Sequence, residues 1–242
     1  MLADLLSIPI DDPINNVHGQ LNDILQAVLS NPPQNSDATL APAWSSVLGH
    51  AMVAYHGADP DACAGIIAES WKTLWSLLES SHRAVRTSAA DALDSVVQCF
   101  TPTMINAALS DSTSPKSVLR KIISQVDKAL DSLAFAAAVP EVLQVLSSLI
   151  TGLRYRGASR ASPTATEKLL MPLITRVAEL RVQKTFEYKE AADVVCSTAM
   201  RVLGPEVLLR ELPLNLEPAD RCVSPLHSRL WRTLTCAIQP NW

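Results

Sequence analysis

The sequence is poor in glycine and in aromatic residues, and it is comparatively rich in proline. Its 242 residues include 7 Gly and 16 Pro, and Phe, Trp and Tyr together make up 5%. So few glycines leave little material for loops that cradle phosphates, and no glycine-based nucleotide-binding or hydrolase motif is present. Strands joined by glycine-rich turns would need a different composition, whereas helices separated by prolines fit this one. We therefore predict an all-α fold.

Cysteine and histidine are also scarce, and neither shows the spacing of a catalytic or metal site. The 5 Cys include no C-x-x-C pair, and the 5 His lie far apart in the sequence. This pattern fits neither a disulfide framework nor a zinc motif. We expect Cys63, Cys99 and Cys196 to be buried free thiols in apolar helices, in a reducing compartment. The sequence thus predicts no metal, no cofactor, no small-molecule substrate and no enzyme activity.

Positive charge is nearly absent from the first third of the chain. Residues 1–80 carry nine acids and a single base, Lys72, whereas residues 81–210 carry 16 bases and 12 acids. Variation between solvated faces is the simpler interpretation, and a basic body that meets RNA or acidic proteins is the functional one. The N-terminus lacks the basic flank of a signal peptide, and we expect no apolar run approaching the roughly 18–20 residues of a membrane span. No membrane partner is therefore predicted.

The clearest helical pattern lies between His82 and Leu93. Its apolar residues recur at spacings of four, seven, eight and eleven: Val85, Ala89, Ala92, Leu93 and Val96. A second apolar helix, 66–78, precedes it after only a few polar residues. This tight helix–turn–helix, with Val85-Arg86 opening its second helix, resembles the HEAT-repeat unit. We expect Arg83 and Arg86 to bond across the turn and to the neighbouring repeat.

Capping residues and prolines divide the remaining chain into further apolar helices. In order, they suggest four antiparallel pairs: 16–30 with 40–56, 60–80 with 83–100, 115–133 with 139–154, and 163–182 with 187–203. The pairs begin about 44, 55 and 48 residues apart, close to the roughly 40–47 residues of a HEAT unit. We predict an α-solenoid of the HEAT/armadillo type, with an irregular helical bundle as the alternative for the less regular pairs.

Two features are candidates for binding. Arg154, Tyr155, Arg156 and Arg160 place three guanidinium groups and one ring in a single loop, and arginine binds phosphate oxygens bidentately. This loop is the candidate contact surface for RNA or a protein partner, and a solvated basic loop is the simpler interpretation.

Trp71 and Trp75 are four residues apart on one helix. They would suit either base stacking or core packing. We favour the core, because Trp71 lies on the apolar stripe.

The segment 186–221 contains the most distinctive sequence motifs in the chain. It contains Phe186-Glu187-Tyr188-Lys189-Glu190, then Gly204-Pro205-Glu206, and then Leu212-Pro213-Leu214-Asn215-Leu216. This passage resembles the ribosomal RNA-processing protein 12 family of HEAT-repeat proteins. The resemblance extends more loosely over residues 1–221, and it corresponds to the N-terminal portion of a longer protein, as if the chain were truncated.

The resemblance implies a non-catalytic HEAT-repeat scaffold for pre-ribosomal RNA processing and for the maturation and export of ribosomal subunits. Its implied partners are pre-ribosomal RNA, pre-ribosomal proteins and nuclear transport factors, in the nucleus and nucleolus with shuttling to the cytoplasm. The family offers no catalytic residues to carry over. We expect a HEAT-like domain over residues 1–221 and a divergent tail over 222–242. The alternatives are a generic α-solenoid adaptor for proteins, resembling a transport receptor, and, less favoured, an α-helical enzyme.

Overall fold

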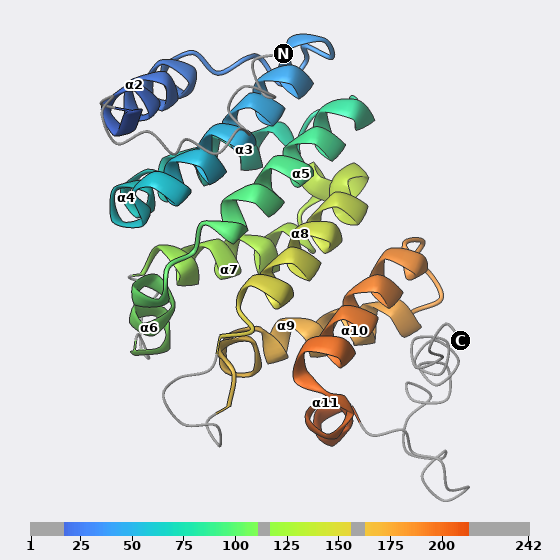
Figure 1. Ribbon diagram of the computed structural model, residues 1–242. Coiled ribbons are helices and arrows are strands. Elements are labelled where there is room, and N and C mark those ends of the chain that lie inside the picture. Colours follow the sequence, from blue (N-terminus) through green and yellow to red (C-terminus); the bar gives the residue numbers. More distant parts are fainter. Residues whose placement is uncertain (1–16, 111–116, 156–162, 213–242) are drawn as a thin grey trace, which may run out of the picture. The chain divides into compact units, whose positions relative to one another are not determined.

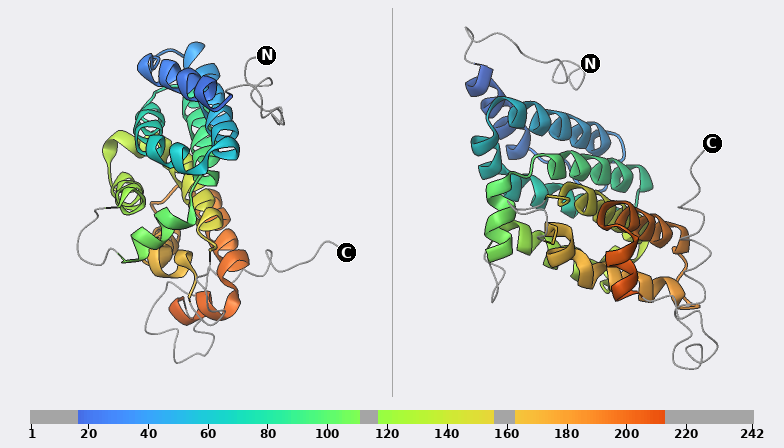
Figure 2. Two further views of the ribbon diagram at one scale, coloured as in Figure 1. Left: turned by 60° about the vertical axis from the view of Figure 1, so that its left-hand side comes forward. Right: turned by 60° about the horizontal axis from the view of Figure 1, so that its bottom comes forward.

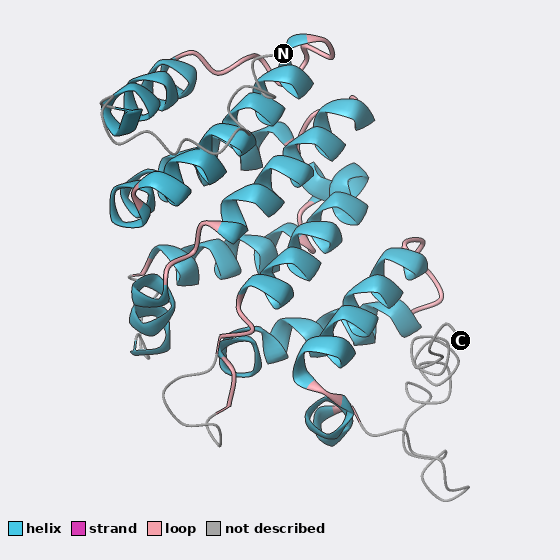
Figure 3. Cartoon of the chain, in the orientation of Figure 1, coloured by secondary structure: helices cyan, strands magenta, loops and turns pink. Residues whose placement is uncertain are grey.

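The computed structural model describes residues 17–110, 117–155 and 163–212, and every regular element within these ranges is a helix (Figures 1 and 3). The elements are α2 (Val17–Ser30), α3 (Leu40–Ala58), α4 (Pro60–Leu77), α5 (Arg83–Gln98), α6 (Pro102–Ser110), α7 (Val118–Ala129), the 3-10 helix η1 (Leu133–Ala138), α8 (Val139–Gly152), α9 (Ala165–Val182), α10 (Lys189–Leu203) and α11 (Pro205–Glu211). The predicted all-α class is confirmed.

The chain divides into two compact units, residues 1–145 and residues 146–242, and the boundary falls within α8. We call them the N-terminal and C-terminal units. The predicted boundary at residue 221 and the predicted tail, 222–242, both lie outside the described residues. Three predicted pairs do pack together, namely α2 with α3, α4 with α5, and α9 with α10.

In the N-terminal unit, the most extensive packing joins α3 to α5, which lie side by side in Figures 1 and 2. A small residue permits the close approach. A Cβ atom built on Gly49 of α3 would stand 3.3 Å from the Cα atom of Ala92 and 3.3 Å from Oγ of Ser95, both on α5. Ser88 of α5 also donates a hydrogen bond to the carbonyl of Pro42 in α3, over 2.8 Å.

A single residue joins α3 to α4. The backbone N–H of Asp59 donates to the carbonyl of Tyr55 over 2.8 Å, which closes α3. The Asp59 carboxylate accepts from the backbone N–H of Ala62 over 3.0 Å, and Pro60 occupies the first helical position of α4. The predicted start of a helix at residue 60 is therefore confirmed, and it follows from an acceptor side chain at the N-cap and a preset backbone angle at proline.

Arg86 is buried, and it bonds as its position in the helix pair predicted. Its guanidinium donates to the carbonyls of Ser80 and Ser81, over 3.0 and 3.1 Å, across the turn between α4 and α5. Its Nε atom lies 3.5 Å from Oε1 of Glu141 in α8, and both side chains are largely covered. The ion pair thus ties α5 to a helix outside its own pair, whereas Arg83 is exposed.

The two tryptophans of α4 belong to the core. Trp71 and Trp75 are 2% and 3% exposed, and their rings stack with centroids 5.7 Å apart. Trp71 donates its indole N–H to the side-chain oxygen of Gln125 on α7 over 3.2 Å. Trp75 contacts Phe135 of η1, with ring centroids 5.6 Å apart. Core packing, not base stacking, is therefore the role of this pair.

In the C-terminal unit, α9 and α10 pack through apolar stripes and one ion pair. Arg181 of α9 donates to both carboxylate oxygens of Asp193 on α10, over 2.6 and 3.2 Å. Gly204 ends α10 with a φ of 86°, a conformation that glycine adopts without strain, and Pro205 then begins α11. The predicted end of a helix at residue 203 is confirmed, whereas the short helix after it was not predicted.

One segment departs from the expectation about long apolar runs. Leu133–Gly152, which covers η1 and α8, has 20 residues and is apolar enough to cross a membrane by length and composition. The expectation that no run approaches this length was therefore wrong for it. Burial inside the molecule accounts for the composition, because Val142, Leu146 and Leu149 are 0% exposed.

The tight approach of α3 and α5 can be tested at Gly49. Replacing Gly49 with Leu should destabilise the protein by about 1–3 kcal/mol, because the added side chain meets the backbone of Ala92. Urea unfolding followed by circular dichroism measures the change. Gly65→Leu is the matched control, since nothing lies within 4 Å of a Cβ atom built on Gly65 of α4. Equal effects of the two substitutions would contradict the close packing.

The buried pair of Arg86 and Glu141 should be strongly coupled. Glu141→Leu alone should cost about 3 kcal/mol of unfolding free energy, because it leaves a buried guanidinium without its counter-charge. Adding Arg86→Met should recover part of that loss, and a double-mutant cycle measures the coupling. The exposed pair of Arg210 and Glu206, 3.7 Å apart, is the control and should couple by less than about 0.5 kcal/mol. A coupling no larger at Arg86 would refute its structural role.

Candidate interaction surface

The predicted contact loop begins at a fixed base in the C-terminal unit. After α8 and Leu153 come Arg154, which is exposed, and Tyr155, which is half-buried. The carbonyl of Tyr155 accepts a hydrogen bond from the backbone N–H of Ala165, over 3.0 Å. The N–H of Thr166 likewise donates to the carbonyl of Leu153 over 3.0 Å. These two bonds hold the start of the loop against the start of α9.

The structure thus brings Arg154 to the surface, as binding requires. Arg156 and Arg160 lie outside the described residues, so their proximity to Arg154 stays a prediction. Arginine at the base of a surface loop can reach phosphate oxygens or acidic side chains, and the exposed guanidinium has only solvent to displace. Nothing in this arrangement selects a base sequence, because phosphate contacts carry no sequence information.

A groove of about 450 Å³ lies in the N-terminal unit between α4, α7 and η1. Its lining residues are Trp75, Glu79, Lys121, Ser124, Gln125, Lys128, Ala129, Ser132 and Phe135. Trp75 and Phe135 are almost fully covered and contribute its aromatic floor, whereas Lys121 and Lys128 are exposed. The two lysines are seven residues apart and therefore lie on one face of α7. An apolar floor with positive charge at its edge suits an acidic peptide segment.

A larger hollow, of about 740 Å³, lies in the C-terminal unit. It is lined by Pro163, Glu167, Lys168, Met171, Pro172, Thr175, Arg176, Glu179 and Glu211. The three glutamates outnumber the two basic residues, so the hollow offers no electrostatic preference for RNA.

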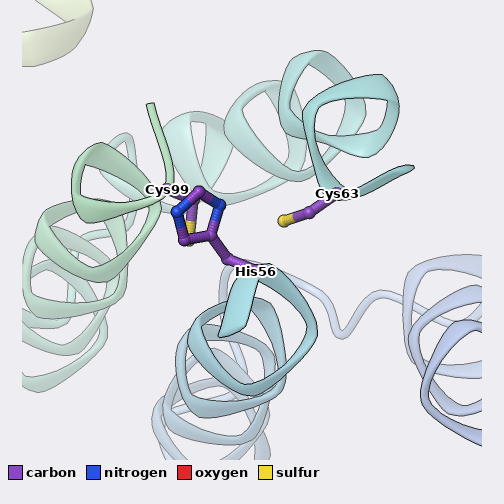
Figure 4. A group of neighbouring side chains, drawn as sticks. All are labelled: His56, Cys63 and Cys99. Carbon is purple, nitrogen blue, oxygen red and sulfur yellow. The ribbon is translucent and has the colours of Figure 1, made fainter. Parts of the chain in front are cut away.

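One side-chain cluster was missed by the sequence analysis. His56, Cys63 and Cys99 each direct one possible ligand atom to a common place, and these atoms all lie within 4.8 Å of one another (Figure 4). His56 is near the end of α3, Cys63 is in the first turns of α4, and Cys99 is the C-cap of α5. The predicted burial of Cys63, Cys99 and Cys196 as unbridged thiols is confirmed.

The two sulfur atoms of the cluster influence each other. A hydrogen bond from the Cys99 thiol lowers the pKa of Cys63, and the same bond, with burial, raises the pKa of Cys99. Burial lowers the pKa of His56, which favours its neutral form. By contrast, burial is the main cause that raises the pKa of Cys196 in α10 to about 12, with a smaller contribution from the nearby charge of Asp193.

No sequence signal pointed to this cluster. Its members are 7 and 36 positions apart, and zinc motifs are recognised by close pairs of ligands. Only the tertiary packing of α3, α4 and α5 brings the three side chains together. A search for ligands on the same ends of packed helices would have found them once the helix pairs had been assigned.

Comparisons with known protein families and with individual proteins point to the same family. A family model described as ribosomal RNA-processing protein 12, HEAT repeats, matches residues 79–231. The chain is 28% identical over 191 residues to a Schizosaccharomyces pombe protein assigned as ribosomal RNA-processing protein 12, covering 78% of this chain and 15% of that protein. The human RRP12-like protein is 25% identical over 211 residues, which cover 86% of this chain and 16% of the relative.

The ribosomal RNA-processing protein 12 of Saccharomyces cerevisiae is 24% identical over 205 residues, covering 80% of this chain and 16% of the yeast protein. The chain therefore spans about a sixth of the length of these curated relatives. Matches to most of a short chain but to a small share of each relative locate the similarity in one part of much longer proteins.

Proposed function

The chain belongs to the ribosomal RNA-processing protein 12 family of HEAT-repeat proteins, with the α-solenoid fold of antiparallel helix pairs, and we propose that it is a non-catalytic scaffold that binds precursor ribosomal RNA. The observation that carries this proposal is the family match over residues 79–231, which includes the basic segment that begins at the exposed Arg154. The relatives are named for ribosomal RNA processing.

Contact with RNA would use charge rather than a pocket. Arg154 stands on a backbone fixed by the hydrogen bonds to Ala165 and Thr166, so its side chain emerges at a defined place beside α9. Arg156 and Arg160 follow within six residues. Guanidinium groups gathered on one loop neutralise neighbouring phosphates and release counterions, which makes such binding sensitive to salt. Tyr155 adds a ring on which an unpaired base can stack.

The proposed role has a cellular setting. We assign the protein to the nucleus and nucleolus, where precursor ribosomal RNA is processed, with shuttling to the cytoplasm as part of subunit export. Pre-ribosomal proteins and nuclear transport factors are its proposed protein partners. A helical scaffold serves these roles by presenting extended surfaces, since each helix pair contributes its own exposed face.

Removing the three arginines tests the RNA proposal. Arg154→Ala, Arg156→Ala and Arg160→Ala together should weaken binding to a transcript of precursor ribosomal RNA. They should also lower the slope of log affinity against log salt by about 2, since each phosphate contact on a single strand contributes roughly 0.7. Filter binding at several salt concentrations measures both quantities. The melting temperature should stay nearly unchanged, because Arg154 is exposed and Arg156 and Arg160 belong to the same predicted loop.

The matched control removes three exposed bases elsewhere, Lys72, Arg83 and Lys184. It changes the net charge by the same amount and should leave most of the RNA affinity. If both triple variants lose the same affinity, binding follows net charge and not the loop. If neither loses any, the basic segment is not the RNA contact.

A second candidate function is supported by the groove between α4, α7 and η1. Its aromatic floor and the two lysines of α7 favour an acidic segment of a protein partner, as in a general α-solenoid adaptor. Lys121→Glu together with Lys128→Glu should reverse the charge at the groove edge and reduce capture of pre-ribosomal proteins by about tenfold or more. Quantitative mass spectrometry of captured proteins, with and without ribonuclease, measures the loss.

The arginine variant provides the comparison for this experiment. Capture that survives ribonuclease, and that falls only in the lysine variant, would establish the adaptor function. Capture that is abolished by ribonuclease in every variant would reject it and leave RNA as the primary ligand. The lysine substitutions should leave stability within about 0.5 kcal/mol, since both side chains are exposed.

A further inference from the structure

Three helix ends meet at one place in the N-terminal unit. α3 closes near His56, α4 opens near Cys63, and α5 is capped by Cys99. Figure 4 shows the imidazole of His56 and the sulfur of Cys63 pointing toward one another, with the Cys99 side chain beside the ring. Their possible ligand atoms lie within 4.8 Å of each other. Three separate helices thus supply one nitrogen and two sulfur atoms to the same small volume.

The set of donor atoms selects a particular class of ion. Thiolate and imidazole ligands favour thiophilic metals such as Zn²⁺, whereas Mg²⁺ and Ca²⁺ take oxygen ligands. In a tetrahedral site with Zn–S bonds of about 2.3 Å, neighbouring sulfur ligands lie roughly 3.8 Å apart. The separations within the cluster are compatible with this geometry after small rotations of the side chains. Two cysteines and one histidine also form a known three-ligand zinc set that leaves a fourth position for water.

The strongest single observation is the state of the His56 ring. Its Nδ1 atom is covered from solvent and has no hydrogen-bond partner among the described residues. A buried polar atom without a partner is rare in native proteins, and a bound ion is one of the few ways to satisfy it. The hydrogen bonds that the two thiols donate to carbonyls are weak, Cys63 to Met52 over 3.6 Å and Cys99 to Ser95 over 3.3 Å. Neither bond uses the lone pairs of sulfur.

We propose that His56, Cys63 and Cys99 bind one thiophilic divalent metal ion of the Zn²⁺ class, a site that the sequence analysis did not predict. Binding releases the two thiol protons to solvent and gives a centre with two thiolates, one neutral imidazole and no net charge. Water completes the coordination. Because the ligands come from α3, α4 and α5, the ion ties together the ends of these three helices. Its binding free energy adds to the stability of the folded N-terminal unit.

Metal titration of the whole 242-residue chain tests the proposal. The protein is reduced, stripped of metal with a chelator and titrated with Co²⁺, whose bonds to thiolate give charge-transfer absorption in the near ultraviolet. We expect the absorption to saturate at about one ion per chain and to vanish when Zn²⁺ is added, since Zn²⁺ binds such sites more tightly than Co²⁺. Absence of thiolate-to-cobalt absorption in the reduced, folded protein would overturn the proposal.

Variants identify the ligands. Cys63→Ser with Cys99→Ser, and separately His56→Ala, should each weaken Zn²⁺ affinity by about 100-fold or more, because loss of a direct ligand exceeds the 10–100-fold typical of an outer partner. Cys196→Ser removes a buried thiol of the C-terminal unit, and His50→Ala removes an exposed histidine of α3. Neither control should change the affinity. Equal losses in the controls, or none in the cluster variants, would refute the assignment.

A second measurement needs no variant, so it holds even if a substituted chain fails to fold. Zn²⁺ should slow alkylation of Cys63 and Cys99 by iodoacetamide at least tenfold, and it should leave the rate at Cys196 unchanged. Peptide mass spectrometry reads the three sites separately. A disulfide between Cys63 and Cys99 in protein isolated without reductant would overturn the proposal, and so would equal alkylation rates with and without the ion.

Discussion

The packing of α5 against α3 and α4 at the same time governs the N-terminal unit. A helix that covers two neighbours must present a wide apolar face, and α5 does so with small residues toward α3. Gly49 and Ala92 let the two backbones approach, and Ser88 adds a hydrogen bond across the contact. Arg86 then bonds to the preceding turn and to Glu141 of α8, so one helix links three others.

Local chemistry predicted much of this fold. Asp59-Pro60 and Gly204-Pro205 set helix boundaries through caps that act over a few residues, and the structure has helices beginning at Pro60 and Pro205. The role of Arg86 was also predicted, from its resemblance to a basic position in the second helix of a HEAT unit. The contact of α3 with α5 was not, since it depends on packing between residues more than 40 positions apart. The cluster of His56, Cys63 and Cys99 was not predicted either, because its members come together only when α3, α4 and α5 pack.

The two candidate binding surfaces, the basic loop and the groove on α7, could be predicted only in part from the sequence. Three arginines within seven residues predicted a basic loop, and the structure adds that its first residue is exposed on a fixed base beside α9. The groove on α7 could not be anticipated, because its floor combines Trp75 with Phe135 from another element. Both surfaces lie on helix faces or connections that the core leaves free. Helical-repeat proteins in general offer extended surfaces of this kind.

The one-residue joint at Asp59 has a consequence for how this region can diverge. Its backbone completes α3 while its side chain opens α4, so the two functions cannot be separated by an inserted amino acid without losing one of them. An added residue would also rotate α4 by about 100° about its axis and turn Trp71 from the interior toward solvent. Insertions and deletions should therefore be rare at this corner among homologous genes. Length variation should accumulate instead in connections where no single residue both ends one helix and caps the next.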